Sequence, residues 1–254
     1  MRKVEQQSTL ADERGANGPS PIAPSQHGER EASAALGGTS LRRDEQGLAL
    51  VGDGMVLRGD FSQLLPRIRK GRLSSELLVR AAKVRDCAEP WAIDATAGLG
   101  EDSFLLAAAG FRVSMYESDP TVAALVRDAL NRAQANPDLA DIACRMELFE
   151  EDSIEAMSHL GDTPDVIYLD PMFPERRKSA AVKKKFQLIH HLEAPCQNEG
   201  ALLAAAISAG PRKVVVKRPA KGPHLAGVKP SHSLAGKAVR YDVIIPASIK
   251  VPLA

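Results

Sequence analysis

The stretch WAIDATAGLGEDSFLLAAA, residues 91–109, decides the fold class of this chain. Its pattern predicts a short buried strand at 91–94, a glycine-rich turn and a helix at 103–109. The glycines let the backbone approach a ligand closely, and the first N–H groups of the following helix can face that ligand. A strand that leads through such a turn into a helix is typical of ligand-binding α/β proteins.

Strands and helices alternate along the rest of the chain. We expect further strands at 111–117, 145–148, 166–170, 213–217 and 241–245, and helices at 121–135, 153–159, 183–192 and 199–208. This order predicts an α/β fold with a mostly parallel sheet and helices on both faces. Ligands bind such sheets at the carboxyl ends of the strands, near the point where the strand order reverses. Functional residues should therefore follow the strands directly.

The chain divides by composition into three parts: an expected disordered tail at 1–46, a small N-terminal hairpin and helix unit at 47–90, and the main domain at 91–254. The tail lacks aromatic residues and any regular apolar period. The glycines of residues 52–54 predict the turn of a hairpin. A helix is expected at 74–84, with Ser74 or Ser75 as its N-cap.

The composition excludes several protein classes. The 254 residues, of which 44% are hydrophobic and 26% charged, are sufficient for one sizeable core. No apolar run approaches the roughly 20 residues of a membrane span, and the N-terminus lacks the apolar core of a signal peptide. The three cysteines form no CxxC pair, so we expect reduced thiols in a cytoplasmic protein.

The net charge of +1 hides a segregation of charge along the chain. Basic residues dominate 58–85 and 211–240, whereas acidic residues dominate 138–165. This distribution favours a molecule with one side that binds anions. Ordinary solvated faces would give the same pattern, so the charges alone do not decide between the two interpretations.

The glycine-rich turn differs from the dinucleotide fingerprint G-x-G-x-x-G, because Ser103 stands where the third glycine would be. Glu101 and Asp102 would also repel a pyrophosphate. A ligand with positive charge and hydroxyl or amino donors fits better, and S-adenosylmethionine has all three. The alternative is a turn shaped only for the packing of helix on sheet.

Two further acidic positions follow predicted strands. Glu117 lies 17 residues after Gly100, where a carboxylate commonly accepts hydrogen bonds from a ribose diol. This role serves NAD and S-adenosylmethionine equally. Asp152 and Ser153 precede a predicted helix, where they could contact an adenine amino group, act as an ordinary N-cap, or do both.

The motif that is most specific for a function is YLDPMFP, residues 168–174. The carboxylate of Asp170 and the carbonyl of Pro171 can together accept two hydrogen bonds from an exocyclic amino group, and Phe173 can stack on the base. Such contacts would hold the amine nitrogen in line with a methyl donor. The alternative is a strand that ends in an Asp-Pro turn with a core phenylalanine.

Together these motifs resemble a known family. DATAGLGED, YES (116–118), FEEDS (149–153) and YLDPMFPERRKSA (168–180) are similar to class I S-adenosylmethionine-dependent methyltransferases with a DPPY-like motif, and more narrowly to the RsmJ family. That family methylates the exocyclic N2 of one guanine in small-subunit (16S) ribosomal RNA. VVVKRP (214–219) and RYDV (240–243) add to the resemblance, which covers roughly 47–246.

The resemblance implies a Rossmann-like class I methyltransferase fold with S-adenosylmethionine as cofactor. The implied cofactor contacts, together with the turn residues singled out above, are Asp94, Gly98, Gly100, Glu101, Asp102, Glu117, Ser118, Asp152, Ser153 and Asp170. The family typically has Arg-Asp and Glu-Arg where this chain has Glu101-Asp102 and Glu117-Ser118. Backbone contacts could serve at Glu101 and Ser118.

The basic residues then acquire a role as contacts to the phosphates of ribosomal RNA or the small ribosomal subunit. They are Arg176, Arg177, Lys178, Lys183, Lys184 and Lys185 after the motif, with Arg67, Arg69, Lys70 and Arg72. A solvated start of a helix is the alternative for the first set. No spacing of metal ligands is found, and no metal is expected.

Other functions remain open from the sequence. Similar DPPY-type motifs also serve methylation of adenine N6 or of a glutamine amide. An NAD-linked oxidoreductase and an RNA-binding module that has lost catalysis are alternatives from other classes.

Overall fold

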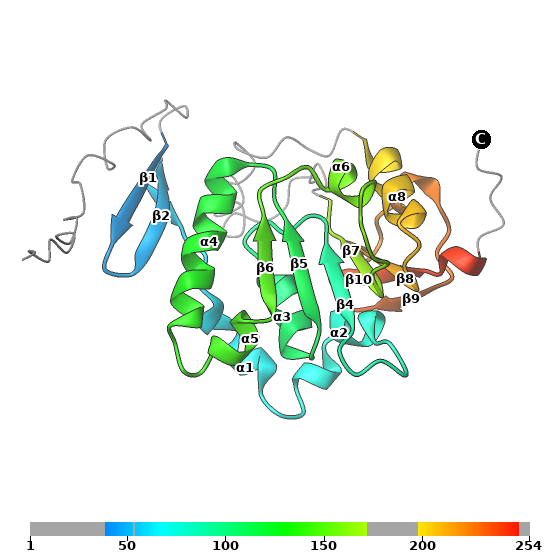
Figure 1. Ribbon diagram of the computed structural model, residues 1–254, viewed down its shortest axis with the longest axis horizontal. Helices are drawn as coiled ribbons and strands as arrows, with labels where there is room; N and C mark the ends of the chain where they lie inside the picture. The colour runs from blue at the N-terminus through cyan, green and yellow to red at the C-terminus, as the bar shows by residue number, and fades with distance from the viewer. Residues whose placement is uncertain (1–38, 53, 172–197, 249–254) are drawn as a thin grey trace, which may run out of the picture. The chain divides into compact units, whose positions relative to one another are not determined.

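The alternating strands form the predicted sheet. The structure is a computed structural model that describes residues 39–52, 54–171 and 198–248, all within the unit Ala35–Ala254 (Figure 1). Seven strands have the order β6-β5-β4-β7-β8-β10-β9. Their bounds are β4 Trp91–Asp94, β5 Arg112–Tyr116, β6 Met146–Phe149, β7 Val166–Leu169, β8 Lys213–Pro219, β9 His232–Ala235 and β10 Val239–Ile244.

The direction of the strands confirms a mostly parallel sheet. The strands β6, β5, β4, β7 and β8 are parallel, and β10 pairs antiparallel with both β8 and β9. From β4 the chain moves outward through β5 to β6, then returns to the other side of β4 for β7 and β8. The strand order therefore reverses between β4 and β7, where a ligand site is expected.

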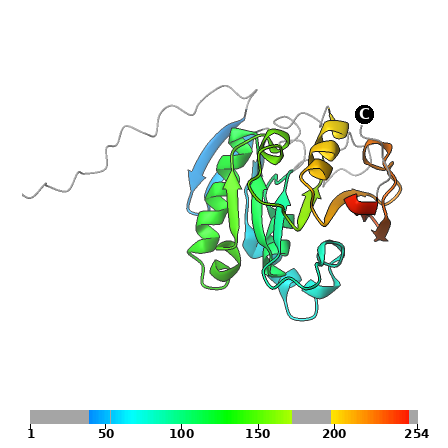
Figure 2. The same ribbon diagram turned by 45° about the vertical axis from the view of Figure 1, so that its right-hand side comes forward.

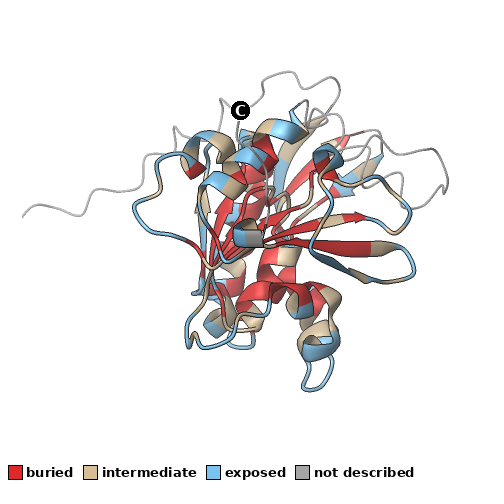
Figure 3. Cartoon of the chain, turned by 90° about the vertical axis from the view of Figure 1, so that its right-hand side faces the viewer, coloured by how far each residue is buried: buried red, intermediate tan, exposed pale blue. Residues whose placement is uncertain are grey.

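Helices cover both faces of the sheet, as predicted. They are α3 Glu101–Ala108, α4 Pro120–Gln134, α6 Ser153–Met157 and α8 Glu199–Ser208, with the short α1 Leu65–Ile68, α2 Leu77–Ala82 and α5 Ala140–Ala143. Strand β7 shows the two-residue period clearly, because Val166 and Tyr168 pack with α3 and α4, whereas Ile167 and Leu169 pack with α8. Figure 3 shows the buried strands between helices on either side.

The helix bounds follow local signals. Asp119 caps α4 by accepting from the N–H groups of Thr121 and Val122, and Pro120 occupies the first turn. Val122, Leu125, Val126 and Leu130, spaced at the helical period along α4, are buried. In contrast, neither Ser74 nor Ser75 caps α2: these residues end a short 3-10 helix, Leu73–Ser75, and α2 begins after Glu76 without a side-chain cap. The helix expected at 183–192 lies outside the described residues.

A second, three-stranded antiparallel sheet precedes the main one. Its strands are β1 Ser40–Asp44, β2 Gly47–Gly52 and β3 Met55–Leu57. The β2–β3 hairpin was predicted, but β1 falls within the expected tail, so that expectation was wrong for Ser40–Asp44. Its side chains are mostly exposed, and its backbone pairing with β2 carries no signal in the apolar pattern.

Asp128 on α4 links this small sheet to the main domain. Its carboxylate accepts from the Arg43 guanidinium at 2.6 Å and from the Leu48 N–H at 3.0 Å, and it pairs with Arg132. Beneath these contacts, side chains of the small sheet pack in one cluster with Leu125. Figure 2 shows β1 and β2 beside α4.

No helix in the described ranges is long and apolar enough to cross a bilayer.

Candidate functional site

Asp94 ends β4 and holds the glycine-rich turn in shape. One carboxylate oxygen accepts from the Thr96 N–H at 3.1 Å, and the other accepts from the Ser103 hydroxyl at 2.5 Å. The residue is 1% exposed. One oxygen is thus bonded to the turn and the other to α3, so Asp94 stabilises the conformation of the predicted cofactor loop.

Burial raises the pKa of the Asp94 carboxyl group. Removal from water raises its pKa to about 7, although hydrogen bonds from Ser103 and Thr96 oppose the rise. The carboxylates of Asp102 and Asp170 add to it.

This pKa predicts a specific pH dependence of stability. The folded pKa is about 7 and the ordinary value of an aspartate is 3.8, so the folded state binds the proton more tightly than the unfolded state. The proton on Asp94 therefore stabilises the folded state fully below pH 4. This contribution to the free energy of unfolding is lost as the pH rises toward 7, at up to about 1.4 kcal/mol per pH unit. We expect Asp94→Asn to lack this loss when urea unfolding is followed by Trp91 fluorescence across the range.

Asp162→Asn is the matched control, because Asp162 is exposed. The difference in unfolding free energy between wild type and Asp94→Asn should shift with pH, whereas the difference for the control should stay constant. A constant difference for Asp94→Asn would contradict the assignment.

Glu117, after β5, is bonded to the glycine loop. Its carboxylate accepts from the Gly98 N–H at 3.1 Å and from the Asp119 N–H at 2.8 Å. Burial raises its pKa, and these N–H groups partly offset the rise. Gly98 has a φ of +52° and a Cβ there would meet no atom within 4 Å, so the loop is open beside the carboxylate. Glu117, which its spacing to Gly100 singled out in the sequence, is thus bonded directly to the glycine loop.

Gly100 starts α3 with a left-handed backbone. Its φ is +74°, and a Cβ would lie 3.3 Å from the Met115 sulfur and from the Phe61 ring. Glycine therefore keeps the turn close to the sheet, which directs the first N–H groups of α3 outward. The next residue, Glu101, is exposed, as is Ser118 after Glu117.

Asp152 is the N-cap of α6. Its Oδ1 accepts from the N–H groups of Ile154 at 2.8 Å and Glu155 at 3.1 Å. Asp152 also lines a hollow of about 540 Å³ together with Tyr116 and Phe149, whose rings stack 5.1 Å apart. The cap interpretation is therefore confirmed, and the hollow places the same side chain beside an aromatic wall at the ends of β5 and β6.

Asp170 follows β7 and is tied to the glycine loop. Its N–H donates to the Thr96 hydroxyl at 2.7 Å, across from the end of β4. Its carboxylate pairs with the Lys217 ammonium at 2.8 Å, and that ammonium also contacts Asp102 at 2.7 Å. The Tyr168 hydroxyl donates to the same Asp102 oxygen at 2.6 Å. The two most informative sequence motifs therefore meet in one polar cluster.

Lys217 is the residue of this cluster that sequence reasoning missed. It lies on β8, directly after Val214, Val215 and Val216, all buried. A lysine that interrupts an apolar strand is a detectable signal, but its neighbours depend on β8 lying beside β7. Burial alone would lower the pKa of Lys217, yet Asp102 and Asp170 outweigh burial and raise it.

The charge of Asp170 depends on the same pairing. Burial raises the pKa of this carboxyl, and Lys217 opposes the rise through its charge and its hydrogen bond. The side chain remains 37% exposed, so it can be reached from outside.

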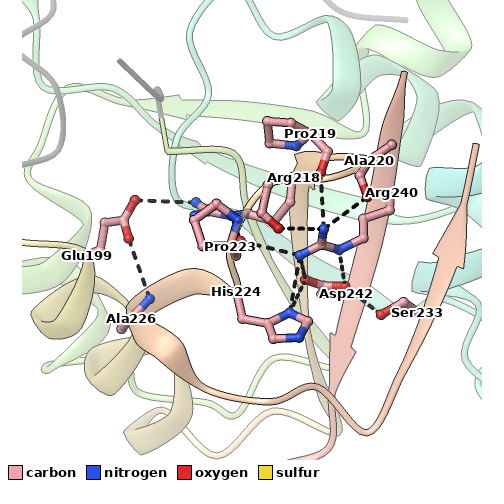
Figure 4. A network of polar contacts seen from close by, with 11 residues as sticks. Glu199, Arg218, Pro219, Ala220, Pro223, His224, Ala226, Ser233, Arg240 and Asp242 are labelled. Carbon is pink, nitrogen blue, oxygen red and sulfur yellow. Dashed lines mark hydrogen bonds and ion pairs between the residues drawn. The ribbon is translucent and has the colours of Figure 1, made fainter. Parts of the chain in front are cut away.

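The chain after β8 is held by Arg240 of β10 (Figure 4). The guanidinium donates to four carbonyl oxygens, those of Pro219, Ala220, Gly222 and Pro223, at 2.8–3.3 Å. It also binds Asp242 through both carboxylate oxygens, at 2.9 and 3.0 Å. This network fixes the segment that directly follows Lys217 and Arg218.

The remaining predicted residues are only partly described. Pro171 is buried. Phe173, Arg176, Arg177, Lys178, Lys183, Lys184 and Lys185 lie outside the described residues. Arg67 forms a two-point pair with Glu76, at 2.9 and 2.8 Å, and Asp102 lies within its electrostatic reach. Arg69, Lys70 and Arg72 are exposed.

These groups fit a cationic ligand without phosphate. Carboxylates of Asp102, Glu117 and Asp170 lie around the glycine loop, and the open space above Gly98 leaves room beside them. A sulfonium or an ammonium group would be attracted there, and a pyrophosphate would be repelled.

Comparison with known proteins also points to S-adenosylmethionine as the ligand of this site. The model of the family described as "Putative SAM-dependent methyltransferase" matches residues 39–246. Ribosomal RNA small subunit methyltransferase J of Neisseria meningitidis serogroup C is 43% identical over 206 residues, which are 80% of this chain and 82% of the relative. The protein of the same name from Stutzerimonas stutzeri is 47% identical over 171 residues, 67% of this chain and 66% of that one. The chain belongs to the RsmJ family of S-adenosylmethionine-dependent methyltransferases.

The fold agrees with this membership. The crystal structure of a SAM-dependent methyltransferase from Neisseria gonorrhoeae matches with a TM-score of 0.68 at 35% identity, over 84% of this chain and 85% of that one. The methyltransferase therefore uses S-adenosylmethionine, which decides the choice that Glu117 alone left open between this cofactor and NAD.

Proposed function

We propose that this methyltransferase transfers a methyl group from S-adenosylmethionine to the exocyclic N2 amino group of a guanine in small-subunit ribosomal RNA. The observation that carries the proposal is the junction of Asp170 with the glycine loop, through the 2.7 Å hydrogen bond to Thr96. This bond fixes the backbone of Asp170 beside the loop that would hold the methyl donor, which supports a role for its carboxylate as an acceptor from an amino group. The names of the relatives support RNA of the small ribosomal subunit as the substrate.

The cofactor would be held by groups at the ends of three strands. Glu117 would accept from the ribose hydroxyls, and the glycine loop at Gly98 and Gly100 would lie against the ligand. Asp152 would meet the adenine amino group while it caps α6. When bound, S-adenosylmethionine supplies an electrophilic methyl group on a sulfonium. Asp94 would act indirectly, since it is enclosed and shapes the loop.

Asp170 and Pro171 would hold the amino group. The carboxylate of Asp170 and the carbonyl of Pro171 would accept its two hydrogens, and Phe173 would stack on the base. The lone pair of an aryl amine is delocalised into the ring, so hydrogen bonds to its protons favour a pyramidal nitrogen that points toward the methyl group. Positioning of this kind supplies most of what a displacement requires.

Basic residues would bind the RNA backbone. Arg67 and Arg69, together with the basic segment at 176–185, would contact phosphates and make the affinity fall steeply with salt. The shape of the folded RNA and the extrusion of one base would supply specificity. Because ribosomal subunits are cytoplasmic, we place the reaction in the cytoplasm.

The test is methyl transfer from radiolabelled S-adenosylmethionine to small ribosomal subunits from cells that lack the enzyme. The RNA is then digested and its labelled nucleosides are identified. We expect label in N2-methylguanosine. Label in N6-methyladenosine would move the base assignment, and cofactor binding without any labelled RNA would overturn the proposed substrate.

A further inference from the structure

We propose that Lys217 is a positioning residue that holds one oxygen of the Asp170 carboxylate and thereby presents the other oxygen to the amino group of the substrate. The inference rests on the function proposed above, and it assigns a role to a residue of β8 that carries none in that mechanism.

The contacts of the ammonium define this role. Lys217 Nζ lies 2.8 Å from Oδ2 of Asp170 and 2.7 Å from Oδ2 of Asp102. It thus joins the end of β7 to the first turn of α3. The lysine side chain is 25% exposed and that of Asp102 is 17% exposed, so water competes little for these bonds.

The second oxygen of Asp170 has a different environment. In residues 39–52, 54–171 and 198–248, no donor is bonded to its Oδ1. Asp170 retains 37% exposure of its side chain, so this oxygen is available to an amino group. A carboxylate anchored at one oxygen has its plane set by that anchor, which is the condition for directing the other oxygen.

The charges around Asp170 show that Lys217 offsets the repulsion between this carboxylate and its acidic neighbours. Among the described residues, acids face it from two elements, Asp102 on α3 and Asp94 at the end of β4, and tyrosines from two more, Tyr168 on β7 and Tyr241 on β10. The cations in the same part of the chain that face it are Lys217 and Arg218, both on β8. Without Lys217, the carboxylates of Asp102 and Asp170 would repel each other, and Asp170 would turn away or take up a proton.

The test compares Lys217→Met with Lys213→Met. Lys213 begins the same strand and donates to the carbonyls of Ala81 and Lys83, away from any carboxylate of the site. Single-turnover methyl transfer is measured with saturating cofactor, whose dissociation constant for each variant is determined by calorimetry. We expect Lys217→Met to lower the maximal rate about 100-fold with little change in the half-saturating RNA concentration, and Lys213→Met to leave both unchanged.

The pH profile separates positioning from simple support of the fold. Loss of Lys217 removes the charge that lowers the pKa of Asp170, so the acidic limb of the rate profile should move to higher pH in Lys217→Met. It should stay in place in Lys213→Met. An unmoved limb, an unchanged rate, or an equal loss in the control would overturn the inference.

Two further measurements test the role of Lys217 independently of this variant. If Lys217→Met does not fold, Lys217→Gln takes its place, because the amide is polar, only one atom shorter and without the charge; a wild-type rate in Lys217→Gln would overturn the inference. The carboxyl ¹³C resonance of Asp170, assigned with Asp170→Asn, should titrate at higher pH in Lys217→Gln than in wild type. This titration needs no RNA, so it tests the role of Lys217 even if wild type labels a nucleoside other than guanosine.

Discussion

Methyl transfer is lost when Asp170 is replaced by alanine, whereas the fold and the binding of S-adenosylmethionine persist: this is the largest effect that the structure predicts. Asp170 lies after the last residue of β7, at the rim of the sheet, and its own N–H bond to Thr96 does not require the side chain. Lys217 keeps a carboxylate partner in Asp102. We therefore expect a fall in single-turnover rate of about 10²–10³-fold or more, with a small change in melting temperature.

Asp170→Asn and Asp162→Ala complete this experiment. The asparagine keeps the shape of the side chain but lacks its charge, so it should also lose most of the rate. Asp162 is an exposed aspartate before β7, and its removal should leave the rate unchanged. A wild-type rate in Asp170→Ala would contradict the assigned role, and a loss of cofactor binding would show that Asp170 acts on the donor side instead.

The second large effect concerns stability. We expect Arg240→Met to lower the free energy of unfolding by about 3–5 kcal/mol, because it leaves a buried carboxylate without its cation. Asp242 is 2% exposed and, among the residues that the structure describes, retains His224 and Ser233 as hydrogen-bonding side-chain partners once Arg240 is gone. The carbonyl oxygens of Ala220 and Gly222 lose the Arg240 donor as well. Urea unfolding followed by Trp91 fluorescence measures the loss.

The pH dependence of this loss has a definite sign. Burial would raise the pKa of Asp242, but hydrogen bonds from Arg240, Ser233 and His224 outweigh it and lower the pKa. In wild type this carboxylate therefore contributes stability above its unfolded pKa, and the contribution is lost as the pH falls through the folded value. Arg240→Met should reduce that contribution, so the difference between variant and wild type should shrink at acidic pH.

Arg212→Met is the matched control for Arg240→Met. Arg212 pairs with Asp165 at 3.0 Å, but 56% of its side chain is exposed. An exposed pair of this kind contributes about 0–1 kcal/mol. Equal losses in the two variants would contradict the view that the buried network holds the segment after β8.

The apolar pattern of the sequence was sufficient to predict the central strands of the sheet. Val166, Ile167, Tyr168 and Leu169 form an apolar run because both faces of β7 are covered, and the same holds for the valines of β8. Once these strands are recognised as parallel, Glu117 and Asp170 must lie at one edge of the sheet. The motifs therefore predict a candidate site at this edge of the sheet.

Elements without an apolar pattern were missed. Strand β9 is polar and mostly exposed, and it exists because its backbone pairs with β10. Strand β1 exists for the same reason, through its pairing with β2, with Asp128 holding Arg43. Backbone hydrogen bonds are common to all residues, so they leave no mark in side-chain composition.

What the sequence by itself determined is the fold class, the family and the edge of the sheet where the candidate site lies, because apolar period and strand-end motifs are local along the chain. The tertiary structure alone decided that Lys217 meets Asp102 and Asp170, and that Arg240 holds the carbonyl oxygens after β8. These contacts join residues far apart in the chain, up to 115 positions for Lys217 and Asp102. They depend on which strands become neighbours, and the packing of the whole domain settles that order.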